Sequence, residues 1–296
     1  MTYIGPYSTT WRLRTKTLAY AQIPLLMGIV NVTPDSFSDG GKWYGAEMAI
    51  EHGLRLVAEG ADILDIGGES TRPYSTPVEV EEEIRRVEPV IRGLAKQCSV
   101  PLSIDTSKAR VAQIALELGA EVINDISGLT GDPQMLGIAK ESRAGICAMH
   151  MQGTPQTMQD SPKYADVTKE VYLYLRGRRD LLLEQGIEFD RICLDPGIGF
   201  GKTHQHNLTL LANYQQFHIL GCPLLGGFSR KGFIGKVLGD KHANRSNANI
   251  GVALALAIQR VQILRVHEIG PIREALSLFS ACGGLDGEPL SLPEEA

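Results

Sequence analysis

The chain of 296 residues lacks the features that mark several large classes of protein. It has no excess of positive charge, since 29 Lys and Arg against 34 Asp and Glu give a net charge of −5. This net charge argues against a general nucleic-acid binder. No apolar run approaches the roughly 20 residues of a membrane-spanning helix. Residues that are 43% apolar and 21% charged exclude a disordered chain and indicate a globular one.

Cysteine is scarce and scattered. The five cysteines are Cys98, Cys147, Cys193, Cys222 and Cys282, and no two of them form a CxxC pair. This odd number argues against a disulfide framework and indicates reduced thiols. The beginning of the chain, MTYIGPYSTTWRLRTKT, lacks the apolar stretch of a signal peptide. We therefore expect a cytoplasmic protein with no membrane or nucleic-acid partner.

One unit recurs along the chain without sequence identity: a short apolar run, a polar loop and a helical pattern. The apolar runs are 23–30, 61–66, 101–104, 121–123, 144–149, 191–194, 223–226 and 263–266. Runs this short and this rich in Ile, Val and Leu suit strands buried on both faces, as in a parallel sheet.

The segments between these runs carry helical periodicity. Within 49–60 and 109–119 the apolar residues recur at three- and four-residue spacing, and Thr106 and Ser107 stand where a helix N-cap is expected. Alternating strands and helices imply parallel strands with right-handed crossovers. Eight units in about 245 residues predict a single α/β (β/α)8 TIM barrel. A doubly wound sheet remains the alternative, because strand number alone does not exclude it.

The two ends of the chain do not follow this repeat. Residues 1–20 form an N-terminal extension, in which 11–20 alternate weakly and predict a hairpin that seals the bottom of the barrel. The barrel itself is expected to span 21–282. Residues 283–296, with Gly, Pro and Glu, are expected to form a flexible acidic tail. No linker or second domain is indicated.

Polar residues stand at the end of every apolar run. In chain order they are Asn31, Asp65, Asp105, Asn124 with Asp125, His150, Asp195, Ser229–Lys231, and Arg265 with His267. The carboxyl ends of the strands of an α/β barrel meet on one face, where active sites are built, so these residues should converge. Any single Asp after a strand can instead be a local cap, and Asp65 and Asp125 are open to that interpretation.

Two loops next to these strand ends are long and polar. Residues 33–41 and 67–73 both contain glycines that can act as hinges. They are either ordinary surface loops or lids that close on a ligand. A third glycine-rich stretch, 195–203, resembles a P-loop but has Pro196 in place of the first required glycine, so the nucleotide-binding pattern fails.

Eight collinear segments closely resemble the dihydropteroate synthase family. They are MGIVNVTPDSFSDGG (27–41), DIGGESTRP (65–73), SIDTSK (103–108), INDISG (123–128), MHMQGTP (149–155), DPGIGFGK (195–202), SRKGFIG (229–235) and RVHEI (265–269). The resemblance implies a (β/α)8 barrel, usually a homodimer, in folate biosynthesis. The implied reaction joins 6-hydroxymethyl-7,8-dihydropterin diphosphate to 4-aminobenzoate, forms 7,8-dihydropteroate and releases diphosphate. It also implies a target of sulfonamides, which mimic aminobenzoate.

The resemblance also implies roles for ten residues. Asp105, Asn124, Asp195 and Lys231 match the pterin site, Thr71, Arg265 and His267 match the diphosphate site, and Asn31 matches a contact to Mg²⁺. Arg72 and Ser229 are candidates for the carboxylate of aminobenzoate. Asp105, Lys231, Arg265 and His267 are expected to be catalytic. These residue types suit the chemistry, because carboxylates and amides complement the N–H groups of a pterin edge and cations complement a leaving diphosphate.

The chain departs from the family pattern at three places. The family commonly has Gly-Ala where Tyr74 and Ser75 stand, Asp at Glu268, and Gly-Ala at 260–261. None removes a residue with an assigned role, but Tyr74 puts the shape of the second loop in doubt. Two alternatives stay open: a pterin-dependent methyltransferase, which needs no diphosphate site, and a catalytically silent synthase-like binding protein.

Overall fold

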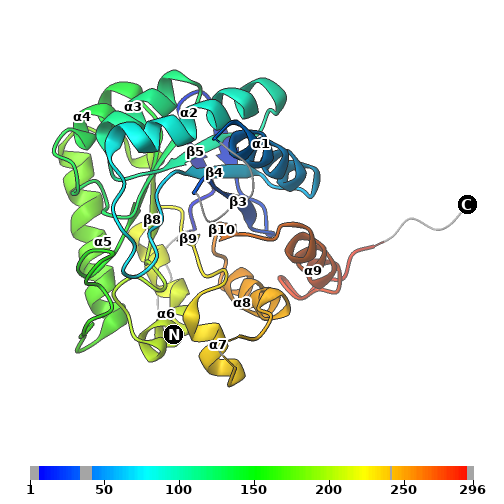
Figure 1. Ribbon diagram of the computed structural model, residues 1–296. Coiled ribbons are helices and arrows are strands. Elements are labelled where there is room, and N and C mark those ends of the chain that lie inside the picture. The colour runs from blue at the N-terminus through cyan, green and yellow to red at the C-terminus, as the bar shows by residue number, and fades with distance from the viewer. Residues whose placement is uncertain (1–6, 34–41, 241, 292–296) are drawn as a thin grey trace, which may run out of the picture.

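Eight parallel strands form the barrel at the centre of the molecule (Figure 1). The structure, a computed structural model, describes residues 7–33, 42–240 and 242–291. The barrel strands are β3 (Leu25–Asn31), β4 (Ile63–Gly67), β5 (Leu102–Asp105), β6 (Val122–Asp125), β7 (Gly145–Met149), β8 (Ile192–Asp195), β9 (Leu225–Gly226) and β10 (Ile263–Val266). Their ends differ from the predicted runs by at most two residues, because polar residues such as Asn31 and Asp105 continue the ladders.

The sheet closes on itself between its two edge strands. The hydrogen-bonded order runs β8-β7-β6-β5-β4-β3-β10-β9, and a parallel bridge between Leu194 and Leu224 joins β8 to the residue before β9. The Leu194 amide donates to the Pro223 carbonyl at 2.9 Å across this seam. Closure confirms the predicted (β/α)8 barrel and rules out the doubly wound sheet.

Helices surround the barrel (Figure 1). They are α1 (Lys42–Ala58), α2 (Val80–Gln97), α3 (Ala109–Glu117), α4 (Met135–Ser142), α5 (Val167–Glu184), α6 (His204–Ala212), α7 (Gly232–Leu238), α8 (Ser246–Ile258) and α9 (Gly270–Ala281), with short 3-10 turns at Phe189–Arg191 and Tyr214–Leu220. Among the described residues, no helix is long and apolar enough to cross a membrane.

Helix α3 begins at Ala109, but the predicted cap is wrong. The Ala109 amide donates to Asp132 Oδ2 at 2.9 Å, from the loop before α4, while the Thr106 hydroxyl accepts from the Lys108 amide. The Ser107 side chain provides no cap either, since the N-cap residue is Lys108 and it too has no side-chain cap bond. A contact between separate loops supplies this cap, so local spacing could not reveal it.

The N-terminal hairpin seals the amino-terminal end of the barrel, as predicted. Strands β1 (Thr10–Arg12) and β2 (Thr17–Ala19) pair antiparallel, and Trp11 and Leu13 are buried. They pack against one layer of barrel side chains: Met27, Ile63, Val122, Cys147, Cys193, Leu225 and Ile263. Their burial removes this end of the barrel interior from water.

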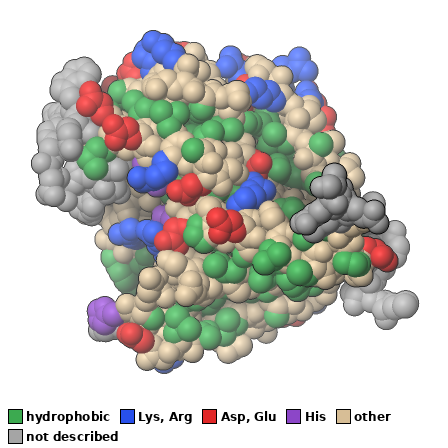
Figure 2. Space-filling model, turned by 90° about the vertical axis from the view of Figure 1, so that its right-hand side faces the viewer, with side chains coloured by type: hydrophobic (Ala, Val, Ile, Leu, Met, Phe, Trp, Pro, Cys, Tyr) green, Lys and Arg blue, Asp and Glu red, His purple; other side chains and the backbone are tan. Residues whose placement is uncertain are grey.

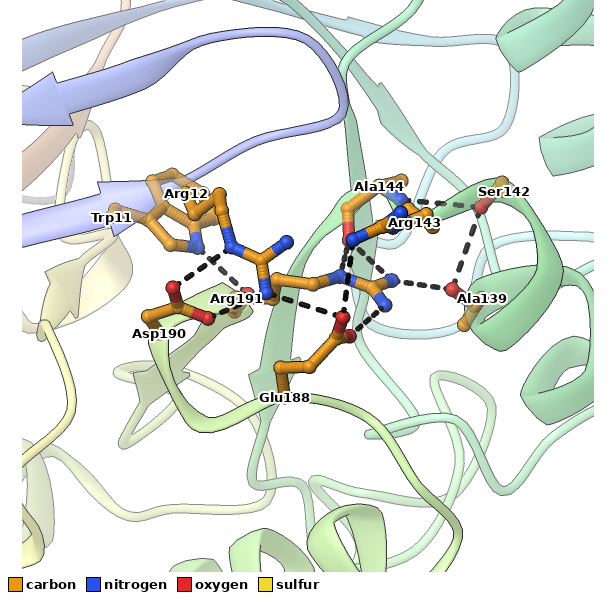
Figure 3. A network of polar contacts seen from close by, with 9 residues as sticks. All are labelled: Trp11, Arg12, Ala139, Ser142, Arg143, Ala144, Glu188, Asp190 and Arg191. Carbon is orange, nitrogen blue, oxygen red and sulfur yellow. Dashed lines mark hydrogen bonds and ion pairs between the residues drawn. The ribbon is translucent and has the colours of Figure 1, made fainter.

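Polar contacts orient this hairpin (Figure 3). Trp11 Nε1 donates to the Arg191 carbonyl at 2.8 Å, and Arg12 makes a two-pronged contact with Asp190 at 2.8 Å for each bond. The buried Arg191 guanidinium in turn donates to the carbonyls of Ala139 and Ala144. The loop before β8 is thereby fixed to the hairpin and to the end of α4.

The carboxyl-terminal residues continue past α9 with their own contacts. The Leu290 amide donates to the Ala281 carbonyl at 2.8 Å, and the Gly284 amide to Phe279. Residues 292–296 of the expected acidic tail lie outside the described part of the chain. All five cysteines are unpaired, as the sequence predicted.

Candidate active site

A cavity of about 900 Å³ lies at the carboxyl ends of the barrel strands. Eight of the ten predicted site residues line it: Asn31, Thr71, Arg72, Asp105, Ser229, Lys231, Arg265 and His267. The other two, Asn124 and Asp195, are buried and do not line the cavity, but they reach the same cluster of polar groups. Residues up to 236 positions apart in the chain therefore meet at one end of the barrel, as the strand ends predicted.

Arg265 on β10 holds two carboxylates together. Its Nε lies 2.5 Å from Asp65 Oδ2, and a terminal nitrogen lies 2.6 Å from Asp105 Oδ2. Asn124 Nδ2 also donates to Asp65 Oδ2, at 3.0 Å. The two carboxylates raise the pKa of Arg265 despite its burial, so its charge is retained.

Asp65 and Asp125, each of which could have been a local cap, have different hydrogen-bond partners. Asp125 does serve local structure: its carboxylate accepts from the amides of Ser127 and Leu129 and closes a turn. Asp65 caps no helix or turn among the described residues and instead receives bonds from Arg265 and Asn124. The structural interpretation is therefore correct for Asp125 and wrong for Asp65, which orients the cation of the site.

Asp105 keeps one acceptor atom open. Its Oδ1 is buried and has no hydrogen-bond partner among the described residues, while its Oδ2 is taken by Arg265. Burial raises the pKa of Asp105, and contact with Arg265 opposes that shift. An unsatisfied buried acceptor is unfavourable unless a ligand donates to it. Asp105 is thus ready to accept from an N–H group bound in the cavity.

Lys231 and Asp195 carry opposite charges in the same buried region. Burial lowers the pKa of Lys231 to about 8 and raises that of Asp195 to about 6. The Lys231 ammonium lies 4.0 Å from the centre of the Phe200 ring, a cation–π distance. Asp195 Oδ1 accepts from the Gly197 amide at 2.7 Å, which fixes the carboxylate. At pH 7 this region offers one ammonium and one carboxylate to a ligand.

Ser229 and His267 form a hydrogen-bonded pair on the cavity wall. The His267 amide donates to Ser229 Oγ at 3.3 Å, and Ser229 Oγ lies 3.0 Å from His267 Nδ1. Burial and nearby cations lower the pKa of His267 to about 3, so the imidazole is neutral. Because the His267 amide already donates to Ser229 Oγ, we assign the serine hydroxyl as the donor to Nδ1, which leaves the imidazole proton on Nε2 for a ligand.

The structure describes the second predicted lid and the root of the first. Residues 34–41 of the first lid lie outside the described part of the chain, which ends there at Thr33 on the cavity wall. In the second loop, Thr71 and Arg72 line the cavity, and Arg72 is exposed. Asn31, at the root of the first lid, makes no side-chain hydrogen bond to any described residue, so its amide can take a ligand.

One buried cation was not assigned from the sequence. Lys202 is almost fully buried, and its Nζ lies 2.9 Å from both His150 Nδ1 and the Phe200 carbonyl. Burial lowers its pKa to about 7. The only signal was its place in the stretch 195–203 that failed as a P-loop. Lys202 holds the loop that places Phe200 beneath Lys231.

The chain is similar to known proteins over most of its length. Residues 27–267 match the model of the pterin binding enzyme family. The dihydropteroate synthase of Escherichia coli (strain K12) is 43% identical over 258 residues, which cover 87% of this chain and 91% of that protein. The structure of the Xanthomonas albilineans dihydropteroate synthase with 4-aminobenzoic acid superposes with a TM-score of 0.86 at 42% identity, covering 93% of this chain and 98% of the other. Its complex with 7,8-dihydropteroate gives a TM-score of 0.82 at 40% identity, covering 92% and 98%.

A closed barrel with this polar cavity, matched over most of the chain, defines the class: the chain belongs to the pterin-binding enzyme family. The identity to characterised relatives places it further, among the dihydropteroate synthases.

Proposed function

We propose that the cavity at the carboxyl ends of the strands is where this chain condenses 6-hydroxymethyl-7,8-dihydropterin diphosphate with 4-aminobenzoate. The activity is that of the dihydropteroate synthases, to which the chain belongs. The observation that carries the assignment to this cavity is the open Oδ1 of Asp105, a buried acceptor beside the cation of Arg265.

The pterin edge would lie against the carboxylates and the amide. Asp105 Oδ1 would accept from a ring N–H or amino group, and Asp195 and Asn124 would bind the other polar atoms of the same edge. Lys231, which lies near Asp195 and Asp105, would donate to the pterin carbonyl oxygen. Donor and acceptor patterns of this kind select a pterin over an apolar ring, because an unpaired buried polar group is unfavourable.

The diphosphate would lie against Arg265, His267 and Thr71. Arg265 brings a retained positive charge, and neutral His267 brings an N–H donor. Among the described residues, no group of three His, Cys, Asp or Glu side chains could hold a metal ion. The amide oxygen of Asn31 fits Mg²⁺, which binds through few protein ligands and completes its shell with water and phosphate oxygens. Bound there, Mg²⁺ would neutralise charge on the leaving diphosphate.

The chemistry follows from these positions. The bond between the pterin methylene carbon and the diphosphate oxygen breaks, and the amine nitrogen forms the new bond and loses a proton. An aromatic amine is neutral at pH 7, so no strong base is needed. Asp105 would stabilise the positive charge that the dihydropterin ring takes up as diphosphate leaves, while Arg265 and His267 stabilise the departing group. Arg72 and Ser229 would position the carboxylate of aminobenzoate.

One face of the molecule carries apolar side chains that are exposed to solvent. Exposed apolar side chains lie among charged ones on the face at the right of Figure 1 (Figure 2). The exposed apolar residues of α8 and α9 include Ile258, 58% exposed, and Leu278, 68% exposed. We assign this face to contact between two copies of the chain, since exposed apolar residues mark interfaces. Sedimentation analysis should show a dimer that Leu278→Glu converts to a monomer. We also propose that the enzyme is cytoplasmic, a proposal that its five unpaired cysteines support.

A turnover assay with purified protein tests the function. We expect 7,8-dihydropteroate and diphosphate in equal amounts when both substrates are present. Binding of both ligands without product would favour a catalytically silent protein. Methyl transfer from a methylated pterin would favour the methyltransferase, although the cationic and donor groups of Arg265 and His267 suit a diphosphate that such an enzyme does not need.

A further inference from the structure

The loop after β4 contains Tyr74, whose backbone is strained and whose side chain contacts another loop. Tyr74 has φ = +63°, a left-handed conformation that is unfavourable for a large side chain and natural for glycine. Such outliers persist only where surrounding contacts determine them, and they gather at functional sites. Tyr74 lines the active-site cavity, directly after Arg72 and Pro73, and is 64% exposed.

Three hydrogen bonds join this loop to the segment 154–160 between β7 and α5. The Tyr74 hydroxyl donates to Asp160 Oδ1 at 3.1 Å, and its amide donates to the Pro155 carbonyl at 3.0 Å. Gln156 Nε2 donates to the Ser75 carbonyl at 3.2 Å. Within the loop, Ser75 Oγ donates to the Ser70 carbonyl. Contacts with the segment 154–160 thus fix the second loop at its tip.

The segment 154–160 also contacts the loop that carries Phe200. Gln159 Nε2 donates to the Gly199 carbonyl at 2.9 Å, next to Phe200, and the Phe200 ring lies under the Lys231 ammonium. Pro73, Tyr74, Phe200 and Lys231 all line the cavity. Pro73, Tyr74 and Phe200 give the cavity rings and apolar surface that can pack against the aromatic ring of aminobenzoate, and we call these three residues the aminobenzoate wall.

We propose that Tyr74 is a positioning residue for the aminobenzoate substrate: its bond to Asp160 straps the 70–75 loop to the 154–160 segment and holds the aminobenzoate wall formed in the free enzyme. This inference rests on the proposed function and adds to it a residue that positions one of the two substrates. A loop that is already ordered spares the substrate the entropy of ordering it, so loss of the strap weakens binding of that substrate. Three of the pterin-site residues, Asp105, Asn124 and Asp195, end β5, β6 and β8, and none of them takes part in the hydrogen bonds of the strap.

Steady-state kinetics of the full-length enzyme tests the strap. Tyr74→Phe removes only the hydroxyl, and Asp160→Ala removes only its acceptor. Each should raise KM for 4-aminobenzoate about threefold, the effect of one partly exposed hydrogen bond, with kcat and KM for the pterin diphosphate unchanged. The double variant should match the single variants, because both remove the same bond. Asp160→Asn, which keeps an acceptor oxygen, should retain the wild-type KM.

Tyr74→Gly should raise KM for aminobenzoate further, since it removes the ring from the wall and frees the backbone. Tyr172→Phe, on the half-buried surface of α5, is the matched control and should change nothing. The proposed role of Tyr74 would be refuted if the Tyr74→Gly enzyme kept the wild-type KM for aminobenzoate. It would also be refuted if KM rose equally for aminobenzoate and for the pterin diphosphate. Wild-type protein that forms no dihydropteroate would instead refute the proposed function, so the two failures are distinct.

Discussion

The guanidinium of Arg265 and the carboxylate of Asp105, 160 positions apart in the chain, meet at 2.6 Å beside the open oxygen Oδ1 of Asp105. One oxygen of the carboxylate is held by the protein and the other is left for a ligand. The site is therefore prepared before substrate arrives, because the cation that orients Asp105 is itself held by Asp65.

Asp105→Asn should lower kcat/KM by roughly a hundredfold or more, the range seen when one preorganised polar group is lost from a site. The amide has nearly the same shape, but it carries no charge to stabilise a cationic pterin. Circular dichroism should show an unchanged fold. Glu117→Gln, an exposed carboxylate on α3, serves as the control and should keep full activity. Near-wild-type turnover of the Asp105 variant would remove this residue from the mechanism.

The pH dependence of kcat/KM should be bell-shaped. Asp105 and Asp195 lose their charges as the pH falls below about 7 and about 6, and Lys231 loses its charge as the pH rises above about 8. The free enzyme then lacks an acceptor on the acid side and a cation on the alkaline side. Lys231→Arg should lose the alkaline limb, whatever its maximal rate, because a guanidinium does not titrate there. A profile flat from pH 5 to 9 would contradict both assignments.

Removal of divalent metal should stop synthesis, and Mg²⁺ should restore it. Asn31→Ala should raise the Mg²⁺ concentration that gives half-maximal rate, since one of few protein contacts is lost. Titration calorimetry of Mg²⁺ with diphosphate gives a second measurement, which does not depend on turnover. Undiminished activity in excess chelator would exclude the role given to Asn31.

Stability should rise with pH in a way that depends on Lys202. Its pKa is about 7 in the folded protein, below the ordinary value of 10.5. Between those values the unfolded chain binds the additional proton, so the free energy of unfolding rises with pH, by at most about 1.4 kcal/mol per unit from this group. Lys202→Met should flatten that rise. Denaturant titrations at pH 7, 8 and 9 compare the slopes, and identical slopes for the two proteins would contradict the shifted pKa.

Trp11→Ala should destabilise the fold by about 3–5 kcal/mol, the range for removal of a large buried ring. Trp11 is fully buried against the barrel interior and donates to the Arg191 carbonyl. Because the hairpin lies at the end of the barrel opposite the cavity, kcat measured well below the melting temperature should be unaffected. A loss of kcat with unchanged melting temperature would show that the hairpin acts on the site itself.

The sequence by itself determined the order of strands and helices and the bounds of the strands to within about two residues, but the helical pattern from residue 49 missed the start of α1, which runs Lys42–Ala58. Buried parallel strands are short apolar runs, and this signal is local. It also placed Asn31, Asp105 and Arg265 at strand ends, and parallel strands bring such ends to one face whatever lies between them. The matched motifs supplied the expected roles, which local chemistry alone would have left open.

Only the tertiary structure decided which of those residues stabilise local structure and which contact the groups of the active site. Asp65 and Asp125 both end apolar runs and look alike in sequence, yet one meets Arg265 from 200 positions away and the other closes a turn two to four residues long. Tyr74 likewise finds Asp160 in another loop. Such partners are set by how the closed barrel brings its loops together, because a hydrogen bond depends on distance and direction in space, and spacing along the chain determines neither.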